Sequence, residues 1–274
     1  MRIEETAPPT VLPRPSVGAP PPPTVPRPAR FTLDNGLRVV AIPRHDLPQV
    51  AVRLVLRAGS AADSPESPGA ASLTASLLTE GTDQYTAVEL NERIDRLGAS
   101  LCARAGHDFA EVDLGLLAET LEEGLPLLAD VVMRPVFPDR EVERVRAEAL
   151  DAFEARLDEP ANVADDRAAL GVFGEKHPYG RVPLGTPEGV RRLRRTDLVD
   201  FHAARYRPAG AILVAAGDFE LSRLRRLLDD CLGDWTGEPE PVRYPDPPTA
   251  PHEAGQLITI DWEEGAQGEI RVAG

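Results

Sequence analysis

Prolines divide this sequence of 274 residues into parts that can form regular structure and parts that cannot. Residues 1–30 hold 10 of the 28 prolines, and residues 236–255 hold six more. Proline fixes φ and has no amide hydrogen, so proline-rich runs favour extended chain over helices and sheets. We therefore expect a disordered arm over residues 1–30, a folded domain over 31–235 and a linker over 236–255. Residues 256–274 would then begin a further unit.

The sequence is apolar enough to bury a core, but its charge is strongly acidic. Hydrophobic residues make up 42% and aromatic residues 5%, so we expect a core of Leu, Val and Ala. The formal net charge of −15 disfavours nucleic acid or an anionic membrane as a partner. One basic run interrupts this pattern, and a solvated helix face explains it better than a binding patch does. The run contains Arg191, Arg192, Arg194 and Arg195.

Nothing in the sequence indicates export or membrane insertion. No run of 18 apolar residues is present, and the first residues show no apolar signal region. The two cysteines, Cys102 and Cys231, are far apart and fit reduced thiols better than a disulfide framework. We therefore expect a cytoplasmic protein.

Apolar periodicity and turn signals predict how strands and helices follow one another along the chain. The expected strands cover residues 30–33, 37–42, 50–56, 99–105, 109–117, 211–216, 257–262 and 269–272. The expected helices cover residues 68–80, 86–97, 119–133, 139–157, 161–173, 196–206 and 221–232. Segregated strands and helices of this kind indicate an α+β layer fold, with helices packed against a largely antiparallel sheet.

The first expected helix is the one around which the rest of the domain is organised. Ser67 is a suitable N-cap, Pro68 suits the first helical position, and Gly81 is placed to end the helix. Three small residues at i, i+3 and i+4 share one face of this helix. A metal-binding helix would place two histidines and a glutamate at this spacing. The three residues are Ser72, Ala75 and Ser76.

No local motif for phosphate binding, nucleophilic catalysis or zinc binding is present in the sequence. No two histidines are closer than 25 residues in sequence, so a local two-histidine site is absent. His107 beside Asp108 indicates a hairpin turn, and the segment that begins at His177 indicates an ordered loop. In both segments a structural role is favoured over a catalytic one.

Several segments, in order, resemble one protein family, over about residues 30–273. The first of them are Asn35-Gly36-Leu37-Arg38-Val39, Arg57-Ala58-Gly59-Ser60 and residues 68–82. The later ones are His177-Pro178-Tyr179-Gly180, Leu184-Gly185-Thr186-Pro187-Glu188, residues 201–206 and Ala216-Gly217-Asp218. The sequence is similar to the pitrilysin and insulinase (M16) zinc metallopeptidases and to the subunits of mitochondrial processing peptidase. The resemblance implies an α+β half-domain, with a mixed sheet and helices on one face.

The zinc motif of that family is not kept in this chain. Its pattern is His-x-x-Glu-His, in which two histidines bind zinc and the glutamate activates the zinc-bound water. The corresponding residues here are Ser72, Ala75 and Ser76, and a further glutamate ligand corresponds to Asp151 or Ala152. Serine hydroxyls are poor neutral zinc ligands, and alanine cannot act as a base. The resemblance therefore implies no catalytic residue, metal ligand or cofactor in this chain.

The family also contains paired subunits, in which one chain holds zinc and the other has lost the motif. The resemblance therefore implies a heterodimer with a zinc-bearing M16 homologue that processes peptides. In catalytic relatives, an edge strand binds extended substrate by strand addition. The equivalent strand here is Ser100, Leu101, Cys102, Ala103, Arg104 and Ala105. Its alternative role is that of a sheet strand with Leu101 and Ala103 packed inside.

Members of the family usually have two similar halves. The segment from Gln267 to Arg271 resembles the start of the second half. Residues 31–235 would then be the N-terminal M16-like domain, and 256–274 the start of a second, truncated one.

Three functions remain open from the sequence. The first is a non-catalytic M16 subunit, inactive on its own, that pairs with a zinc-bearing partner to bind and process peptides. The second is a purely structural M16-like core subunit. The third is an enzyme with changed chemistry at a metal site built elsewhere in the chain.

Overall fold

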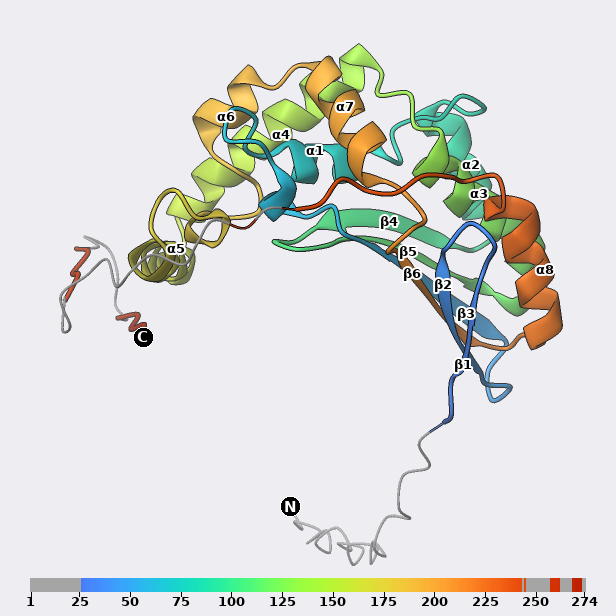
Figure 1. Ribbon diagram of the computed structural model, residues 1–274. Coiled ribbons are helices and arrows are strands. Elements are labelled where there is room, and N and C mark those ends of the chain that lie inside the picture. The colour runs from blue at the N-terminus through green and yellow to red at the C-terminus, as the bar shows by residue number, and fades with distance from the viewer. Residues whose placement is uncertain (1–25, 243, 245–256, 262–267, 273–274) are drawn as a thin grey trace, which may run out of the picture.

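The computed structural model describes residues 26–242, 244, 257–261 and 268–272. These residues contain a six-stranded sheet in the order β1-β2-β6-β3-β5-β4, with helices over one face (Figure 1). The strands are β1 (Ala29–Thr32), β2 (Arg38–Pro43), β3 (Gln49–Leu56), β4 (Ser100–Ala105), β5 (Ala110–Leu117) and β6 (Ile212–Gly217). The predicted α+β fold, with a mixed and mostly antiparallel sheet covered on one face, is confirmed.

Turn chemistry explains the first hairpin. Gly36 adopts a positive φ of 89° between β1 and β2, a conformation that glycine reaches without steric cost. The Asn35 amide donates hydrogen bonds to the carbonyls of Leu232 and Trp235, which anchors this turn to the end of α8 (Leu221–Leu232). The strands predicted over residues 30–33 and 37–42 are therefore confirmed, and they pair as a hairpin.

Pairing at the centre of the sheet is less local. Strand β6 lies between β2 and β3, parallel to β2 and antiparallel to β3. The residues of β3 alternate between exposed and buried, because only one face of the sheet is covered by helices. The parallel pair connects residues about 170 positions apart, which no local pattern in the sequence indicates.

The helix layer buries the Leu, Val and Ala side chains that the composition predicts. The helices are α1 (Ala70–Leu77), α2 (Ala87–Arg96), α3 (Leu121–Met133), α4 (Asp139–Leu157), α5 (Pro160–Phe173), α6 (Pro187–Arg192), α7 (Arg195–Arg205) and α8. Short 3₁₀ turns are η1 (Ser60–Ala62), η2 (Ala118–Thr120) and η3 (Pro178–Gly180). The predicted long amphipathic helix over 139–157 is confirmed, with Val142, Val145 and Ala149 buried.

Two helices do not begin at the residue that the sequence predicts. Helix α1 begins at Ala70, not at Pro68, because Gly69 takes a positive φ of 104° and the buried Asp63 carboxylate supplies the cap. It ends at Leu77, before Gly81. Helix α7 begins at Arg195, one residue before its predicted start at Thr196. Local sequence signals identified these helices but misplaced their ends, since the cap of α1 comes from a residue outside the helix.

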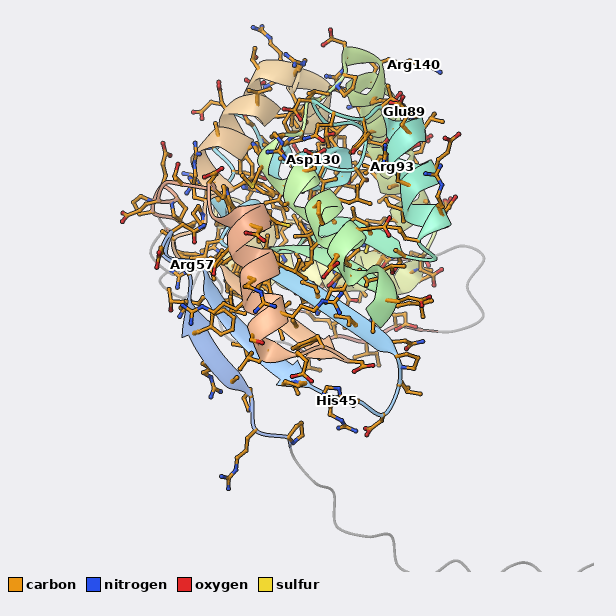
Figure 2. The ribbon with its side chains drawn as sticks, turned by 90° about the vertical axis from the view of Figure 1, so that its right-hand side faces the viewer. His45, Arg57, Glu89, Arg93, Asp130 and Arg140 are labelled. Carbon is orange, nitrogen blue, oxygen red and sulfur yellow. The ribbon has the colours of Figure 1, made fainter. Side chains whose placement is uncertain are left out.

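The opposite ends of the molecule carry different polar contacts (Figure 2). Glu89 and Arg93 lie on α2, where Glu89 forms a capping box with Thr86. His45 lies at the far end, in the β2–β3 connection, where its Nδ1 is 2.6 Å from Asp218 Oδ1. The bond to the Asp218 carboxylate raises the pKa of His45.

The predictions for the two ends of the chain have different outcomes. The disordered arm predicted over 1–30 lies almost wholly outside the described residues. Residues 257–261 and 268–272 are described and form no strand, so the strands predicted there are wrong. Extended apolar segments need a neighbouring strand to pair with, and neither edge of the sheet, β1 or β4, pairs with them.

Within the described residues, no helix combines the length and apolar character needed to cross a bilayer.

Candidate functional site

Helix α1 lies at the centre of the helix layer, in contact with β4, α4 and α7 (Figure 1). Its Leu73 and Leu77 side chains are fully buried in the core. The helix N-terminus is held by Asp63, whose two carboxylate oxygens accept hydrogen bonds from Gly69 N at 2.7 Å and Ala71 N at 2.8 Å. The position of α1 is thus fixed by core packing and by a buried cap.

Burial raises the pKa of the Asp63 carboxyl to about 7. The two backbone N–H bonds, and the positive charges of Arg181 and Arg205, act in the opposite direction. Burial outweighs them because desolvation penalises the charged form of a carboxyl group.

The three residues at the motif positions of α1 have no shared chemical environment. The Ser72 hydroxyl is half-buried and donates to the Pro183 carbonyl at 2.9 Å. Ala75 is fully buried, whereas Ser76 is exposed. One hydroxyl is already hydrogen-bonded, and a methyl group stands where a base would be needed. These side chains do not fit a zinc ion, which prefers imidazole, thiolate and carboxylate ligands.

Helix α4 runs beside α1 and carries the predicted third-ligand positions. Asp151 and Ala152 are both exposed. The two helices are linked by Arg144 of α4, which forms an ion pair of 2.5 Å with Glu80 just beyond α1. Over the described part of the chain, no group of three or more His, Cys, Asp or Glu side chains could hold a metal ion.

Strand β4, the predicted peptide-binding strand, lies at the edge of the sheet and pairs there with β5. Ser100, Cys102 and Arg104 are exposed on one face of the strand. Leu101 and Ala103 are half-buried and pack against the core. An edge strand keeps one row of backbone groups unpaired within its sheet, which is what strand addition requires. Leu101 and Ala103 therefore have the predicted packing role. The edge position of β4 is also compatible with the predicted peptide binding.

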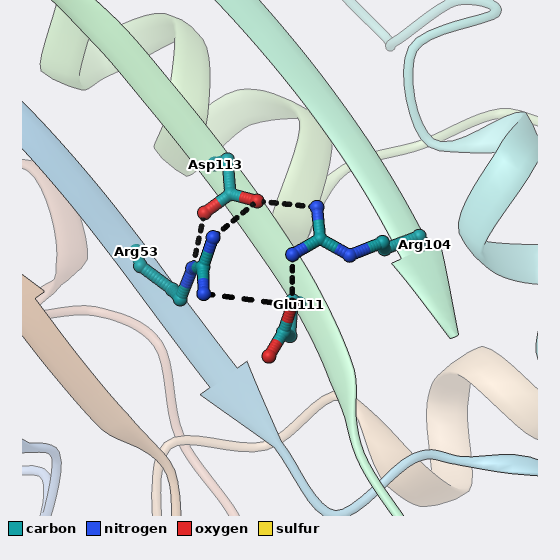
Figure 3. Close-up of polar contacts among 4 residues, drawn as sticks. All are labelled: Arg53, Arg104, Glu111 and Asp113. Carbon is teal, nitrogen blue, oxygen red and sulfur yellow. Dashed lines mark hydrogen bonds and ion pairs between the residues drawn. The ribbon is translucent and has the colours of Figure 1, made fainter. Parts of the chain in front are cut away.

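The open face of the sheet next to this edge carries a four-residue charge cluster (Figure 3). Asp113 of β5 accepts from Arg53 Nε at 2.5 Å and from Arg104 at 2.7 Å. Glu111 pairs with Arg104 as well. The two arginines and two carboxylates of the cluster balance in charge. Asp113 and Glu111 hold Arg104 on the sheet surface. Hydrogen bonding to Asp113 raises the pKa of Arg53.

A second polar cluster lies at the turn between β4 and β5, and no local sequence pattern predicts it. We define the hairpin tip as residues 106–109. The Asp108 Oδ1 atom accepts hydrogen bonds from the Tyr179 hydroxyl at 2.6 Å and from the Tyr244 hydroxyl at 2.8 Å. The His107 and Tyr179 rings lie 5.0 Å apart. His107, Asp108 and the loop from His177 were each predicted to be structural, but not to meet.

Comparison with known proteins identifies the family. The insulinase family, peptidase family M16, matches residues 38–174. The peptidase M16 inactive domain matches residues 192–273. The chain therefore belongs to peptidase family M16, which confirms the resemblance found in the sequence. The boundaries predicted for its domains stay a prediction.

Individual relatives agree with this assignment. An uncharacterized zinc protease of Mycobacterium leprae is 30% identical over 204 residues, or 74% of this chain and 46% of the relative. Subunit 1 of the rat (Rattus norvegicus) mitochondrial cytochrome b-c1 complex is 28% identical over 207 residues, or 76% of this chain and 43% of the relative. This chain thus spans less than half the length of these two relatives.

A solved structure has the same fold. The peptidase M16 inactive domain from Pseudomonas fluorescens superposes with a TM-score of 0.75 and is 25% identical. The match covers 81% of this chain and 54% of that one.

Proposed function

We propose that this chain is a non-catalytic M16 subunit that pairs with a zinc-bearing M16 homologue to bind and process peptides. The observation that carries the proposal is helix α1. It keeps its central place, its buried Leu73 and its cap, while Ser72, Ala75 and Ser76 stand at the motif positions. These features support a chain that is built like a zinc-binding M16 chain but has no zinc ligands at these three positions.

The edge strand gives the proposed subunit a way to contact substrate. Strand β4 lies against α1, so a peptide added beside β4 would lie close to the helix of this chain whose counterpart in the partner would carry zinc. Recognition would come mainly from backbone hydrogen bonds, which tolerate many side chains. The zinc would belong to the partner, and the sequence predictions of a cytoplasmic location and of no binding to nucleic acid or membranes accompany this proposal.

The likeness to a subunit of the cytochrome b-c1 complex favours a second candidate, a purely structural role. In that case the chain would assemble stably with partners, and no peptide would be cleaved by the assembly. A third candidate, changed chemistry at another metal site, would require a metal bound by the pure chain.

The test combines this chain with an M16 homologue that carries His-x-x-Glu-His. We expect a mixed complex in which peptides are cleaved, with neither chain active alone and zinc only in the partner. A stable but inactive complex would favour the structural role. Zinc-dependent cleavage by the pure chain would overturn the proposal.

Hydrogen exchange can test the role of the edge strand separately. Bound peptide should slow exchange of the β4 amides, residues 100–105, in the mixed complex. The opposite edge strand, β1 (Ala29–Thr32), is a control within the same sheet and should show no change. Peptide cleavage without protection of β4 would remove the strand from the proposal while leaving the pairing of subunits intact.

A further inference from the structure

The chain that follows α8 is docked onto the folded domain. We call residues 235–242 and 244 the strap. Trp235 is buried, and its indole nitrogen donates to the Tyr206 carbonyl at 3.1 Å. Farther along, the Glu240 amide donates to the Ala204 carbonyl, and its carbonyl accepts from Arg205 at 2.6 Å. The strap thus follows the end of α7 across the molecule (Figure 1), although its sequence is part of the predicted linker.

The strap reaches the hairpin tip at Tyr244. Its hydroxyl shares one acceptor, Asp108 Oδ1, with the hydroxyl of Tyr179. The two tyrosine rings lie 6.4 Å apart in an edge-to-face arrangement. Hydrogen bonding to the Asp108 carboxylate raises the pKa of Tyr179 to about 12. Hydrogen bonds to a charged acceptor are stronger than neutral ones, so this junction ties three distant segments together.

The hairpin tip is also joined to the loop before α1. The amides of Ser60 and Ala61 donate to the tip carbonyls of Gly106 and His107 at 2.9 and 2.7 Å. The Gly59 amide donates to the Asp108 carbonyl at 3.3 Å. Inside the tip, Gly106 N donates to Phe109 O at 2.8 Å. These four amides report directly on whether the tip is closed.

We propose that the contact of Tyr244 and Tyr179 with Asp108 is a latch that couples the strap to the edge strand β4. While the latch is closed, the hairpin tip stays docked and β4 keeps its extended, paired form. When Tyr244 leaves, the tip opens and β4 loosens at the end nearest the tip. The regulatory meaning of the latch rests on the proposed function, because it governs the strand that would bind peptide.

Through the latch, the strap, which leads out of this domain, would control the conformation of β4. A displacement of the strap by whatever is attached beyond Tyr244 would be transmitted to the tip through one shared carboxylate oxygen. The preformed strand would bind extended peptide better than a loose one, because less ordering is needed on binding.

The experiment is native-state hydrogen exchange on the full chain and its Tyr244→Phe and Tyr179→Phe variants. Each substitution removes one hydroxyl and keeps the ring. We expect exchange at the Gly59, Ser60, Ala61 and Gly106 amides to become about five- to tenfold faster. Tyr85→Phe is the matched control, because Tyr85 contacts Arg93 on α2 and should leave these amides unchanged.

Two results would overturn the latch. One is unchanged exchange at the four amides in both variants. The other is an equal acceleration throughout the domain, including the central strands β3 and β6, which would assign the hydroxyls to overall stability.

A measurement of peptide binding distinguishes failure of the latch from failure of the proposed function. Because the exchange experiment contains no peptide, it tests the latch whether or not the chain binds one. If the wild-type complex binds an extended peptide, we expect Tyr244→Phe to weaken that binding and Tyr85→Phe to leave it unchanged. Absence of wild-type binding would count against the proposed function alone, and equal binding by all three would overturn the control of β4.

Discussion

The loop before α1 leads into the helix at one end and contacts the hairpin tip at the other. The side chains of α1 and those of the tip nevertheless form different kinds of contact. The motif face of α1 offers a hydroxyl bound to Pro183, a buried methyl group and an exposed serine. At the tip, the Asp108 carboxylate meets two phenols that lie 71 and 136 positions farther along the chain. Polar side chains thus join distant segments at the tip, whereas the predicted motif face of α1 offers no side chain that suits a metal.

The difference between α1 and the tip would change most if the His-x-x-Glu-His motif were placed on α1. The substitutions Ser72→His, Ala75→Glu and Ser76→His, with Ala152→Glu on α4, should let the chain bind about one zinc ion, because three protein ligands make a catalytic-type site. Metal content by mass spectrometry or plasma emission is the measurement. The same set with Asp151→Glu in place of Ala152→Glu is the matched variant, and it decides which position corresponds to the third ligand. If neither set binds zinc, the assignment of these vacated positions is wrong.

The tip can be disturbed by a single methyl group. A Cβ at Gly59 would overlap the His107 carbonyl, a backbone atom that cannot move without shifting the tip. We expect Gly59→Ala to lower the free energy of unfolding by about 2 kcal/mol, as overpacking commonly does. Urea denaturation measures this change. Gly98→Ala has no nearby atom to meet, although its positive φ of 59° adds some strain. A smaller loss at Gly59 than at Gly98 would contradict the tight docking of the tip.

The cap of α1 makes a prediction about pH. The pKa of Asp63 is raised from 3.8 to about 7, so the folded state holds its proton more tightly than the unfolded state. The contribution of Asp63 to stability is therefore largest below pH 4 and falls as pH rises toward 7. The fall is complete once the pH exceeds the folded-state pKa of about 7.

Urea denaturation between pH 4 and 8 measures the effect. Other carboxylates titrate in the same range, so the quantity to compare is the difference between wild type and Asp63→Asn. The wild type should lose stability relative to the variant as pH rises through this window. A difference that does not change with pH would show that Asp63 titrates normally.

The open-face charge cluster should have the smallest effect. Arg104 is about half exposed, and exposed ion pairs contribute little because water and salt screen them. We expect Arg104→Gln to cost less than about 1 kcal/mol of stability, and the loss should shrink in high salt. A double-mutant cycle with Asp113→Asn isolates the pair. A salt-independent loss larger than that at Gly59 would mean that the cluster, rather than the tip, holds β4.

The sequence predicted a region correctly where its structure depends on residues that are close in sequence, and incorrectly where it depends on residues that are far apart. The six strands of the sheet, the helix α4 and the place of Ser72, Ala75 and Ser76 on one helix depend on local periodicity, and the predictions for them hold. The start of α1 depends on Asp63, and the parallel pairing of β2 with β6 connects opposite ends of the domain. The Asp108 contacts join residues 71 and 136 positions apart, so no short pattern could reveal them. One usable signal was overlooked: Thr86 and Glu89 form a capping box that marks the start of α2.

The central position of β6 also bears on the order in which the chain can fold during synthesis. Before residues 212–217 emerge, the β1–β2 hairpin and the β3–β5–β4 unit each expose one strand edge that the finished sheet closes. Unpaired edges of this kind invite pairing with other chains. The sheet is completed only when its last strand enters between two that formed much earlier, so we expect slow folding and aggregation of nascent chains that stop short of β6.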